Sequence, residues 1–249
     1  MLEINHLAVI SRLLPFSAKV KRGDRVHIIG PNGAGKSSLL AAIAGMLKAE
    51  GEVVIAGNRI TELSGRELSR YRSYLCQQYL PLSAMPVYQY LSLHQIAGSS
   101  AEAVDKTLTQ LCNLLHLNDK LAHKITQLSG GEWQRVRLVA TLLQVWPSVN
   151  PQGCLLLLDE PANSLDIAHQ QALDLIINEF CSEGGIAIIS DHDLNHTLQH
   201  ACRVWMLSQG EVIANGLTAE VMQPEPLSLN YGVFFKLHHF EGRSWIMTV

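Results

Sequence analysis

Charged and aromatic residues are both scarce in this sequence. Charged residues make up 16% and aromatic residues 6% of its 249 positions, while hydrophobic residues reach 47%. A chain this apolar, with a formal charge of only −3, is unlike intrinsically disordered proteins, and its length allows a large buried core. The small negative charge also disfavours a broad basic face, so we expect no nucleic-acid partner.

Long apolar runs are missing as well. The longest, around Leu155–Leu158 and Ile186–Ile189, have the length of strands, whereas a membrane-spanning helix needs about 20 apolar residues. The first residues, Met1-Leu2-Glu3-Ile4-Asn5, lack the charged-then-apolar order of a secretory signal. We therefore expect a soluble cytosolic chain that reaches a membrane only through a partner.

Cysteine is present but shows no pairing pattern. The five cysteines are odd in number and contain no C-x-x-C pair; they are Cys76, Cys112, Cys154, Cys181 and Cys202. This usage favours reduced thiols over a disulfide framework or a cysteine metal site.

Strand and helix patterns alternate along the chain, which predicts an α/β fold with a parallel sheet. Buried strands are expected at Val26–Ile29, Leu155–Leu158 and Ile186–Ile189. Helices are expected from Lys36 to Leu47 and from about Ile167 to Cys181. Continuous apolar runs are typical of parallel strands whose two faces are both covered by helices.

Three further segments complete this outline. Residues 51–60 predict a hairpin with a turn at Gly57-Asn58. Helical spacing dominates residues 80–146, where a buried stripe is expected to comprise Val104, Leu108, Leu111, Leu114 and Leu115. Residues 204–249 alternate between apolar and polar and are expected to add short strands. We therefore assign one domain over 1–249, with an α/β core at 1–79 and 151–249 and a helical subdomain at 80–150.

A glycine-rich loop lies between the first expected buried strand and its helix. It reads Gly30-Pro31-Asn32-Gly33-Ala34-Gly35-Lys36-Ser37, followed by Ser38, and fits the phosphate-binding pattern G-x-x-x-x-G-K-S/T. Glycines let consecutive N–H groups turn toward the phosphates of a nucleotide such as ATP. Lys36 adds a positive charge for the β and γ phosphates, and Ser37 offers a hydroxyl to Mg²⁺.

Two carboxylates follow the strand at Leu155–Leu158. Asp159 and Glu160 stand at the carboxyl end of that strand, where open parallel sheets bind their ligands. We expect Asp159 to hold the Mg²⁺ that bridges the phosphates. Glu160 is the candidate general base for the attacking water.

A second candidate anion site lies in the helical segment. The sequence Gln127-Leu128-Ser129-Gly130-Gly131-Glu132 resembles the Leu-Ser-Gly-Gly-Gln signature of ATP-binding-cassette (ABC) proteins, with Glu132 in place of glutamine. Ser129, Gly130 and Gly131 precede a helix expected to start near Glu132, so their N–H groups can bind an anion. The resemblance implies a P-loop NTPase core with a parallel sheet, a small antiparallel β subdomain and an inserted helical subdomain. It also implies two copies arranged head to tail around two ATP.

Other residues match the ABC family in order and spacing. Gln77 resembles the glutamine that senses metal and water, and Gln78 is an adjacent alternative. Residues 163–166 resemble the loop that crosses the dimer interface, and His192 resembles the histidine at the γ-phosphate. The segment Ile10–Pro15 departs from the family, because it lacks the aromatic residue that stacks on adenine.

Residues 128–138, 146–153 and 190–197 resemble a narrower group, the vitamin B12 (cobalamin) import ATPases of Gram-negative bacteria. That resemblance implies a peripheral subunit at the cytoplasmic face of the inner membrane. Its partners would be two transmembrane permease subunits and, indirectly, a periplasmic substrate-binding protein. The candidate permease contact lies near Met85-Pro86-Val87. An iron-chelate importer or a non-transport ABC ATPase are the alternatives.

Overall fold

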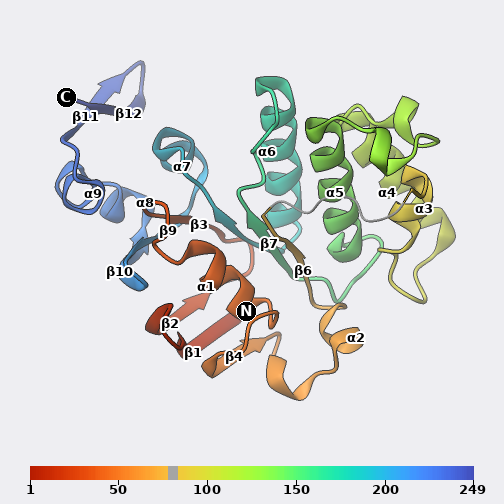
Figure 1. Ribbon diagram of the computed structural model, residues 1–249, viewed down its shortest axis with the longest axis horizontal. Coiled ribbons are helices and arrows are strands. Elements are labelled where there is room, and N and C mark those ends of the chain that lie inside the picture. The colour runs from red at the N-terminus through yellow and green to blue at the C-terminus, as the bar shows by residue number, and fades with distance from the viewer. Residues whose placement is uncertain (78–83) are drawn as a thin grey trace.

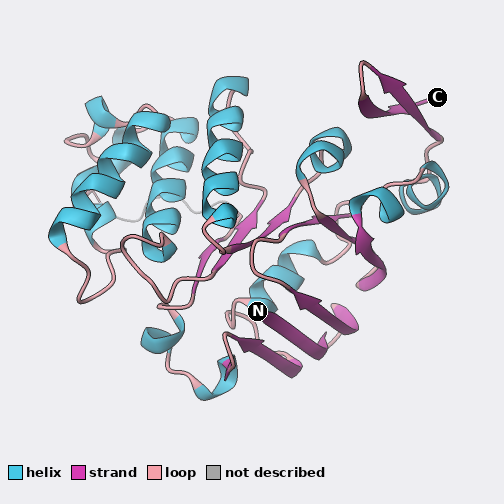
Figure 2. Cartoon of the chain, turned by 180° about the vertical axis from the view of Figure 1, so that it is seen from behind, coloured by secondary structure: helices cyan, strands magenta, loops and turns pink. Residues whose placement is uncertain are grey.

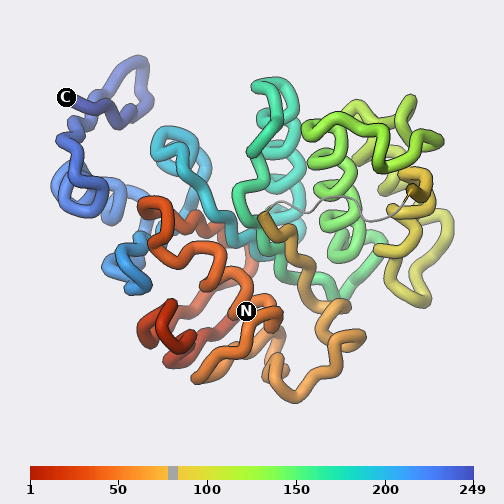
Figure 3. The backbone as a smooth tube through the Cα atoms, viewed as in Figure 1, coloured from red at the N-terminus to blue at the C-terminus, as the bar shows by residue number. Residues whose placement is uncertain are grey.

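The computed structural model describes residues 1–77 and 84–249. A central sheet separates an antiparallel β sheet on one side from a group of helices on the other (Figure 1). The C-terminal hairpin stands away from the body, on the side opposite these helices (Figures 2 and 3). This arrangement confirms the predicted α/β class.

The central sheet has six strands in the order β10-β9-β3-β8-β7-β6. Strands β6, β7, β8, β3 and β9 run parallel to their neighbours, and β10 is antiparallel to β9. The strands are β3 (Arg25–Ile29), β6 (Arg72–Leu75), β7 (Leu155–Asp159), β8 (Ile186–Ser190), β9 (Arg203–Ser208) and β10 (Glu211–Leu217). All residues of β3, β7 and β8 are buried, which explains their unbroken apolar runs.

Successive residues of these strands enter two different hydrophobic cores. In β7, Leu155 and Leu157 pack with helix α1 (Lys36–Ile43) and the antiparallel sheet. Leu156 and Leu158 pack instead with α5 (Gly130–Val145) and α6 (Ile167–Ser182). The alternation follows from the two-residue period of a strand. Because these strands run parallel, their carboxyl ends lie at one edge of the sheet.

The antiparallel sheet has the order β2-β1-β4-β5. Its strands are β1 (Leu2–Val9), β2 (Leu13–Val20), β4 (Glu50–Ile55) and β5 (Asn58–Arg59), and η1 (Ile60–Glu62) and α2 (Gly65–Leu68) follow it. The predicted hairpin exists, but its turn lies one residue earlier, at Ala56-Gly57, where φ is 51° and 86°. Two consecutive positive φ angles match the twist of a two-residue hairpin turn.

The helical part shares its core with the central sheet. It contains α3 (Val87–Ser92), α4 (Ala101–Leu114), η2 (Asn118–Lys120), η3 (Ile125–Gln127) and α5. Val104, Leu111 and Leu115 are buried and Leu108 is half-buried, as predicted. Leu114 is wrong as a core residue, because it is 36% exposed. Positions 104, 108, 111 and 115 already fill one helical face, and 114 falls beside it.

The C-terminal region contains more helix than the alternating pattern predicted. Helix α7 (Leu194–His200) precedes β9. After β9 and β10 come α8 (Thr218–Val221), which contacts α7, and α9 (Pro224–Tyr231), and then the hairpin of β11 (Phe235–Phe240) and β12 (Arg243–Thr248). Pro224 stands at the first position of α9, where its missing N–H costs nothing. All five cysteines are free, as predicted. In the described part of the chain, every helix is too short or too polar to cross a membrane.

Candidate functional site

The phosphate loop joins the carboxyl end of β3 to the start of α1. Gly30 has φ 148°, and a Cβ there would lie 2.3 Å from the carbonyl oxygen of Leu207. Gly35 caps α1 in the left-handed region, with φ 106°. No side chain caps the first turn of α1. Its free N–H groups therefore face outward at the positive end of the helix dipole.

A cavity of about 400 Å³ opens over these N–H groups. The described residues that line it are Asn32, Gly33, Ala34, Gly35, Lys36, Ser37, Ser38, Gln77 and Glu160. The structure thus brings most of the predicted phosphate-binding residues to one hollow. Gly30 and Pro31 lie behind them and bind Lys36 through their carbonyl groups.

Lys36 is held inside this loop by main-chain oxygens. Its Nζ donates to the carbonyl of Gly30 at 2.7 Å and to that of Pro31 at 3.2 Å, and the residue is only 6% exposed. Burial lowers the pKa of Lys36, and the nearby carboxylates of Glu160 and Asp159 oppose that shift. The arrangement presents an ordered donor group next to the cavity.

Asp159 is the last residue of β7 and is 2% exposed. Its Oδ1 accepts a hydrogen bond from Ser190 Oγ at 2.5 Å, but its buried Oδ2 has no hydrogen-bond partner among the described residues. A buried carboxylate oxygen without a partner is costly, and a cation would satisfy it. The donor set of Asp159, Ser37 and Gln77, all oxygen ligands, therefore fits Mg²⁺.

Glu160 follows in a left-handed conformation, with φ 49°. Its N–H donates to Ser190 Oγ at 2.9 Å. Its Oε2 accepts from Gln77 Nε2 at 2.9 Å and from Asn163 Nδ2 at 2.6 Å. The carboxylate is thus aimed by two amides from different loops. Gln78, the alternative to Gln77, lies outside the described residues.

Ser190 and Asn163 are parts of this site that the sequence reasoning did not assign to it. Ser190 Oγ contacts both carboxyl-bearing residues, through Asp159 Oδ1 and the Glu160 N–H. Ser190 of β8 lies beside Asp159 of β7 because the two strands pair, and the sequence alone does not give this strand order. Asn163 was predicted as part of an interface loop. The hydrogen bond that its side-chain amide donates to Glu160 is a further contact.

His192 follows β8 and is exposed. It lines a cavity of about 280 Å³ together with Glu160 and Asn163. The histidine and the candidate base therefore face the same region at the sheet edge. This edge is where parallel α/β folds bind their ligands.

The signature segment forms the start of α5. Ser129 Oγ accepts from the N–H of Glu132 at 3.3 Å, and Glu132 Oε2 accepts from the N–H of Ser129 at 2.8 Å. This reciprocal pair is a capping box, so the helix begins at Gly130, two residues before Glu132. The Ser129 hydrogen bonds and the Lys120 ammonium, 3.0 Å away, lower the pKa of Glu132 to about 2.

The signature segment and the phosphate loop line two neighbouring cavities, which share Gln77 and Glu160. The described residues around the phosphate cavity do not include Ser129, Gly130 or Gly131. Gly130 instead lines a cavity of about 220 Å³ beside Gln77, Glu160 and Ser164. The two anion-binding helix starts therefore do not share one hollow in this chain.

Gly131 packs directly on the loop that precedes α6. A Cβ at Gly131 would lie 2.7 Å from the carbonyl oxygen of Ser164, whereas one at Gly65 would meet nothing within 4 Å. We expect Gly131→Ala to displace this loop and to lower ATPase turnover roughly 10–100-fold, by misplacing Asn163 and Glu160. Steady-state kinetics of both alanine variants tests this, because Gly65→Ala should keep full activity. Equal turnover in the two variants would contradict it.

The helical part is tied to this site by two polar side chains of α5. Arg137 is 6% exposed and donates to the carbonyl of Cys76, the residue before Gln77. Gln134 donates to the carbonyl of Pro161 at 3.0 Å. A shift of α5 would therefore pull on the residues that flank Gln77 and Glu160.

The segment Met85-Pro86-Val87 is not an exposed face. Val87 is fully buried, and Met85 packs half-buried against the helical core. Main-chain hydrogen bonds hold these residues against the segment before α5. For example, the Ile125 N–H donates to the Met85 carbonyl at 3.0 Å. The exposed apolar side chains nearby are Tyr88 at 60% and Leu93 at 67%.

This arrangement is that of an ATPase of the cassette type. It combines a phosphate loop and a signature helix with an acidic pair whose Glu160 carboxylate is oriented by two amides. A sequence profile of the ABC transporter family matches residues 13–163. The chain belongs to this family and is an ATP-hydrolysing subunit of the ABC type. A solved structure described as the ATP-binding subunit of an ABC transporter superposes with a TM-score of 0.80 at 25% identity, covering 93% of each chain.

Curated relatives match over their full length. The Vitamin B12 import ATP-binding protein BtuD of Yersinia pseudotuberculosis is 52% identical over 248 residues, covering 100% of this chain and 98% of the relative. The protein of the same name from Escherichia coli O139:H28 is 46% identical over 252 residues, with 100% and 98% covered.

Proposed function

We propose that this chain is the ATPase subunit of a vitamin B12 importer and that it drives uptake by binding and hydrolysing ATP. The observation that carries the ATPase mechanism is the carboxylate of Glu160, held by Gln77 and Asn163 at the edge of the phosphate cavity. The transported substrate rests on the relatives, which are named for vitamin B12 import and match the whole chain at 46–52% identity.

ATP enters with its phosphates over the start of α1. N–H groups from Gly33 to Ser38 receive the phosphate oxygens, and Lys36 places its charge beside the β and γ phosphates. Ser37, Gln77 and Asp159 would hold Mg²⁺, which supplies charge neutralisation on the phosphates when bound. The partnerless Asp159 Oδ2 supports this ligand set.

Glu160 acts as the general base. Gln77 and Asn163 keep its Oε2 fixed, so the other carboxylate oxygen can accept a proton from the attacking water. His192, on the far side of Glu160, contacts the γ-phosphate and stabilises the charge that develops on it. These roles assign one residue each to proton transfer and to phosphate stabilisation.

Two copies of the chain work head to tail. The support is that none of Ser129, Gly130 and Gly131 is among the described residues that line the phosphate cavity, whereas Gly130 lines the neighbouring cavity. In the pair, the N–H groups of one signature close over the γ-phosphate held by the other chain. ATP thereby joins the copies, and loss of the γ-phosphate releases them.

The dimer is tested by its dependence on nucleotide. Glu160→Gln should be monomeric in the apo form and dimeric with MgATP, as measured by light scattering after size-exclusion chromatography. Adding Ser129→Arg should abolish the dimer while leaving MgATP affinity intact, because the arginine side chain blocks the partner's γ-phosphate. A dimer that forms equally without ATP, or that survives Ser129→Arg, would contradict the head-to-tail arrangement.

The permease partners bind the helical part at the cytoplasmic face of the inner membrane, with a periplasmic binding protein delivering substrate on the other side. Tyr88 and Leu93 are exposed apolar residues at α3 and support a contact there. The complex purified from membranes should take up vitamin B12 in liposomes in an ATP-dependent way. Uptake of an iron chelate instead would refute the substrate and leave the ATPase mechanism unchanged.

A further inference from the structure

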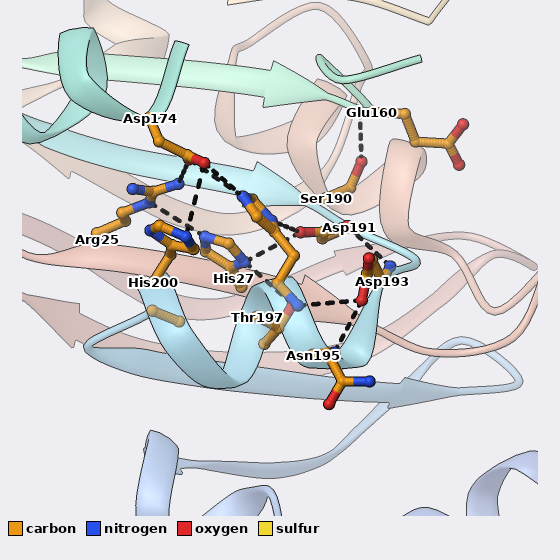
Figure 4. A network of polar contacts seen from close by, with 12 residues as sticks. Arg25, His27, Glu160, Asp174, Ser190, Asp191, Asp193, Asn195, Thr197 and His200 are labelled. Carbon is orange, nitrogen blue, oxygen red and sulfur yellow. Dashed lines mark hydrogen bonds and ion pairs between the residues drawn. The ribbon is translucent and has the colours of Figure 1, made fainter. Parts of the chain in front are cut away.

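Five polar side chains, one of them from the residue before His192, form a closed ring of hydrogen bonds and ion pairs (Figure 4). Its members come from four separate segments: Arg25 and His27 from β3, Asp174 from α6, Asp191 from the loop after β8, and His196 from α7 (Leu194–His200). Four of these residues are less than 9% exposed, and His196 is half-buried.

The arginine fixes the protonation state of the first histidine. Arg25 Nε donates to His27 Nε2 at 3.2 Å, and because a guanidinium can only donate, Nε2 must be an acceptor. His27 is therefore neutral, with its proton on Nδ1, which lies 3.1 Å from Thr197 Oγ1 and 3.4 Å from Asp191 Oδ2. Complete burial agrees with this, since it lowers the pKa of His27 to about 4.

The second histidine must be charged. His196 Nδ1 lies 2.5 Å from Asp191 Oδ2, and its Nε2 lies 3.0 Å from Asp174 Oδ2. Ionised carboxylates only accept hydrogen bonds, so both ring nitrogens must carry a proton. Burial alone would lower the pKa of His196, but the hydrogen bonds and charges of the two carboxylates outweigh it and raise the pKa to about 9.

Charges alternate around the ring: Arg25 is positive, Asp174 negative, His196 positive and Asp191 negative, with His27 neutral. Although His27, Asp191 and His196 lie close enough to hold a metal ion, two cations already neutralise the two carboxylates. A divalent ion would have to displace the His196 protons beside a buried guanidinium. The geometry therefore favours a ring closed by hydrogen bonds and ion pairs over a metal site.

The ring connects the three segments that carry the nucleotide chemistry. β3 leads into the phosphate loop, α6 begins just after the loop of Asn163, and Asp191 directly precedes His192. Asp191 is also fixed on its own loop, since its Oδ1 accepts from the Asp193 N–H at 2.9 Å and its N–H donates to the Ile28 carbonyl at 3.0 Å.

We infer that the His196 imidazolium is a positioning residue for ATP hydrolysis, which holds the His192 loop and helix α6 in register with the phosphate loop. The inference rests on the proposed roles of His192 and Glu160. His196 acts through Asp191 and Asp174 and does not touch the nucleotide. Without the charge of His196, Arg25 is the one cation left in the ring for two buried carboxylates. Repulsion between Asp174 and Asp191 then separates the His192 loop from α6.

The protonation state is testable in the unaltered protein. The chain has 11 histidines, and ¹⁵N-histidine NMR at pH 8 should show a doubly protonated ring that titrates near pH 9. This signal should vanish in His196→Gln. Detection of neutral histidines alone at pH 8 would overturn the inference, and the measurement does not depend on the folding of any variant.

Kinetics tests the positioning role. His196→Gln should lower kcat for ATP roughly 10–100-fold through misplacement of His192, with KM for MgATP near the wild-type value because the phosphate loop is untouched. His200→Gln is the matched control: it lies one turn further on α7, packs on the His196 ring at 4.7 Å and lies 3.6 Å from Asp174, but it is not a member of the ring, so its kcat should stay near wild type. Wild-type kcat in His196→Gln would overturn the inference.

The pH profile separates positioning from general destabilisation. The groups facing His196 are Asp174, Asp191, His27, His200 and Arg25. Because the pKa of His196 is raised when folded, its contribution is complete below about pH 6.5 and is lost as the pH rises through about 9. Because turnover is measured on folded protein, wild-type kcat should hold to about pH 8 and fall as the pH rises through about 9, and His196→Gln should lack this step. If His192→Ala retained full turnover, the proposed role of His192 would fail instead, whatever the NMR result.

Discussion

Replacing Glu160 with glutamine is expected to lower ATP turnover about 10²–10⁴-fold, the usual cost of removing a general base. This corresponds to about 2.7–5.4 kcal/mol of activation free energy. The amide keeps the size of the side chain but cannot accept the proton of water at the free oxygen. MgATP affinity should remain near wild type, because in the proposed site the phosphates bind at the start of α1, which the substitution leaves unchanged.

The control for this experiment is Glu183→Gln, the same change at an exposed residue at the end of α6. Single-turnover hydrolysis and equilibrium nucleotide binding should be measured for both variants. The control should match wild type in both measurements. Turnover near wild type in Glu160→Gln would remove Glu160 from the role of base.

Lys36→Ala should weaken binding of MgATP roughly 10–100-fold, since hydrogen bonds to charged groups contribute about 1.5–3 kcal/mol each. The Lys36 ammonium is held at the phosphate cavity by the carbonyls of Gly30 and Pro31. Alanine removes the charge and leaves the glycine backbone in place. Turnover at saturating ATP should fall as well, because the γ-phosphate loses a cation.

Isothermal titration calorimetry measures this affinity directly. Lys48→Ala removes an exposed lysine just after α1 and should bind MgATP as the unaltered chain does. Circular dichroism checks that Lys36→Ala is folded. An unchanged dissociation constant in folded Lys36→Ala would show that the lysine does not contact the phosphates.

The parts of the fold that could be predicted are those with strong local patterns. The apolar runs at Leu155–Leu158 and Ile186–Ile189 became buried parallel strands because helices cover both faces of the sheet. The glycine loop lies between strand and helix as its motif requires. The helices at 218–221 and 224–231 were missed, since each is too short to show a helical period.

Contacts between distant segments were the main features of the site that the sequence did not reveal. Ser190 meets Asp159 only because β8 pairs with β7. Arg25 and His27 lie in a strand whose other residues are apolar, and their partners Asp174 and Thr197 lie 149 and 170 residues further along the chain. Such polar pairs follow from strand order and helix placement, which no single local pattern encodes.

The burial of Met85-Pro86-Val87 shows the same limit. The segment was the candidate permease contact, but it pairs with residues before α5, as in the bridge between Pro86 and Lys124. Its side chains therefore face the helical core. Tyr88, one residue on, points to solvent because the first turn of α3 rotates it away.

The meeting of one chain's signature with the other chain's γ-phosphate is tested most directly by vanadate photocleavage. Vanadate trapped with MgADP occupies the place of the γ-phosphate, and ultraviolet light then cuts the backbone nearest to it. The account predicts two cuts, one in the phosphate loop near Lys36 and one near Ser129. Cleavage in the phosphate loop alone, under conditions where vanadate blocks turnover, would contradict it.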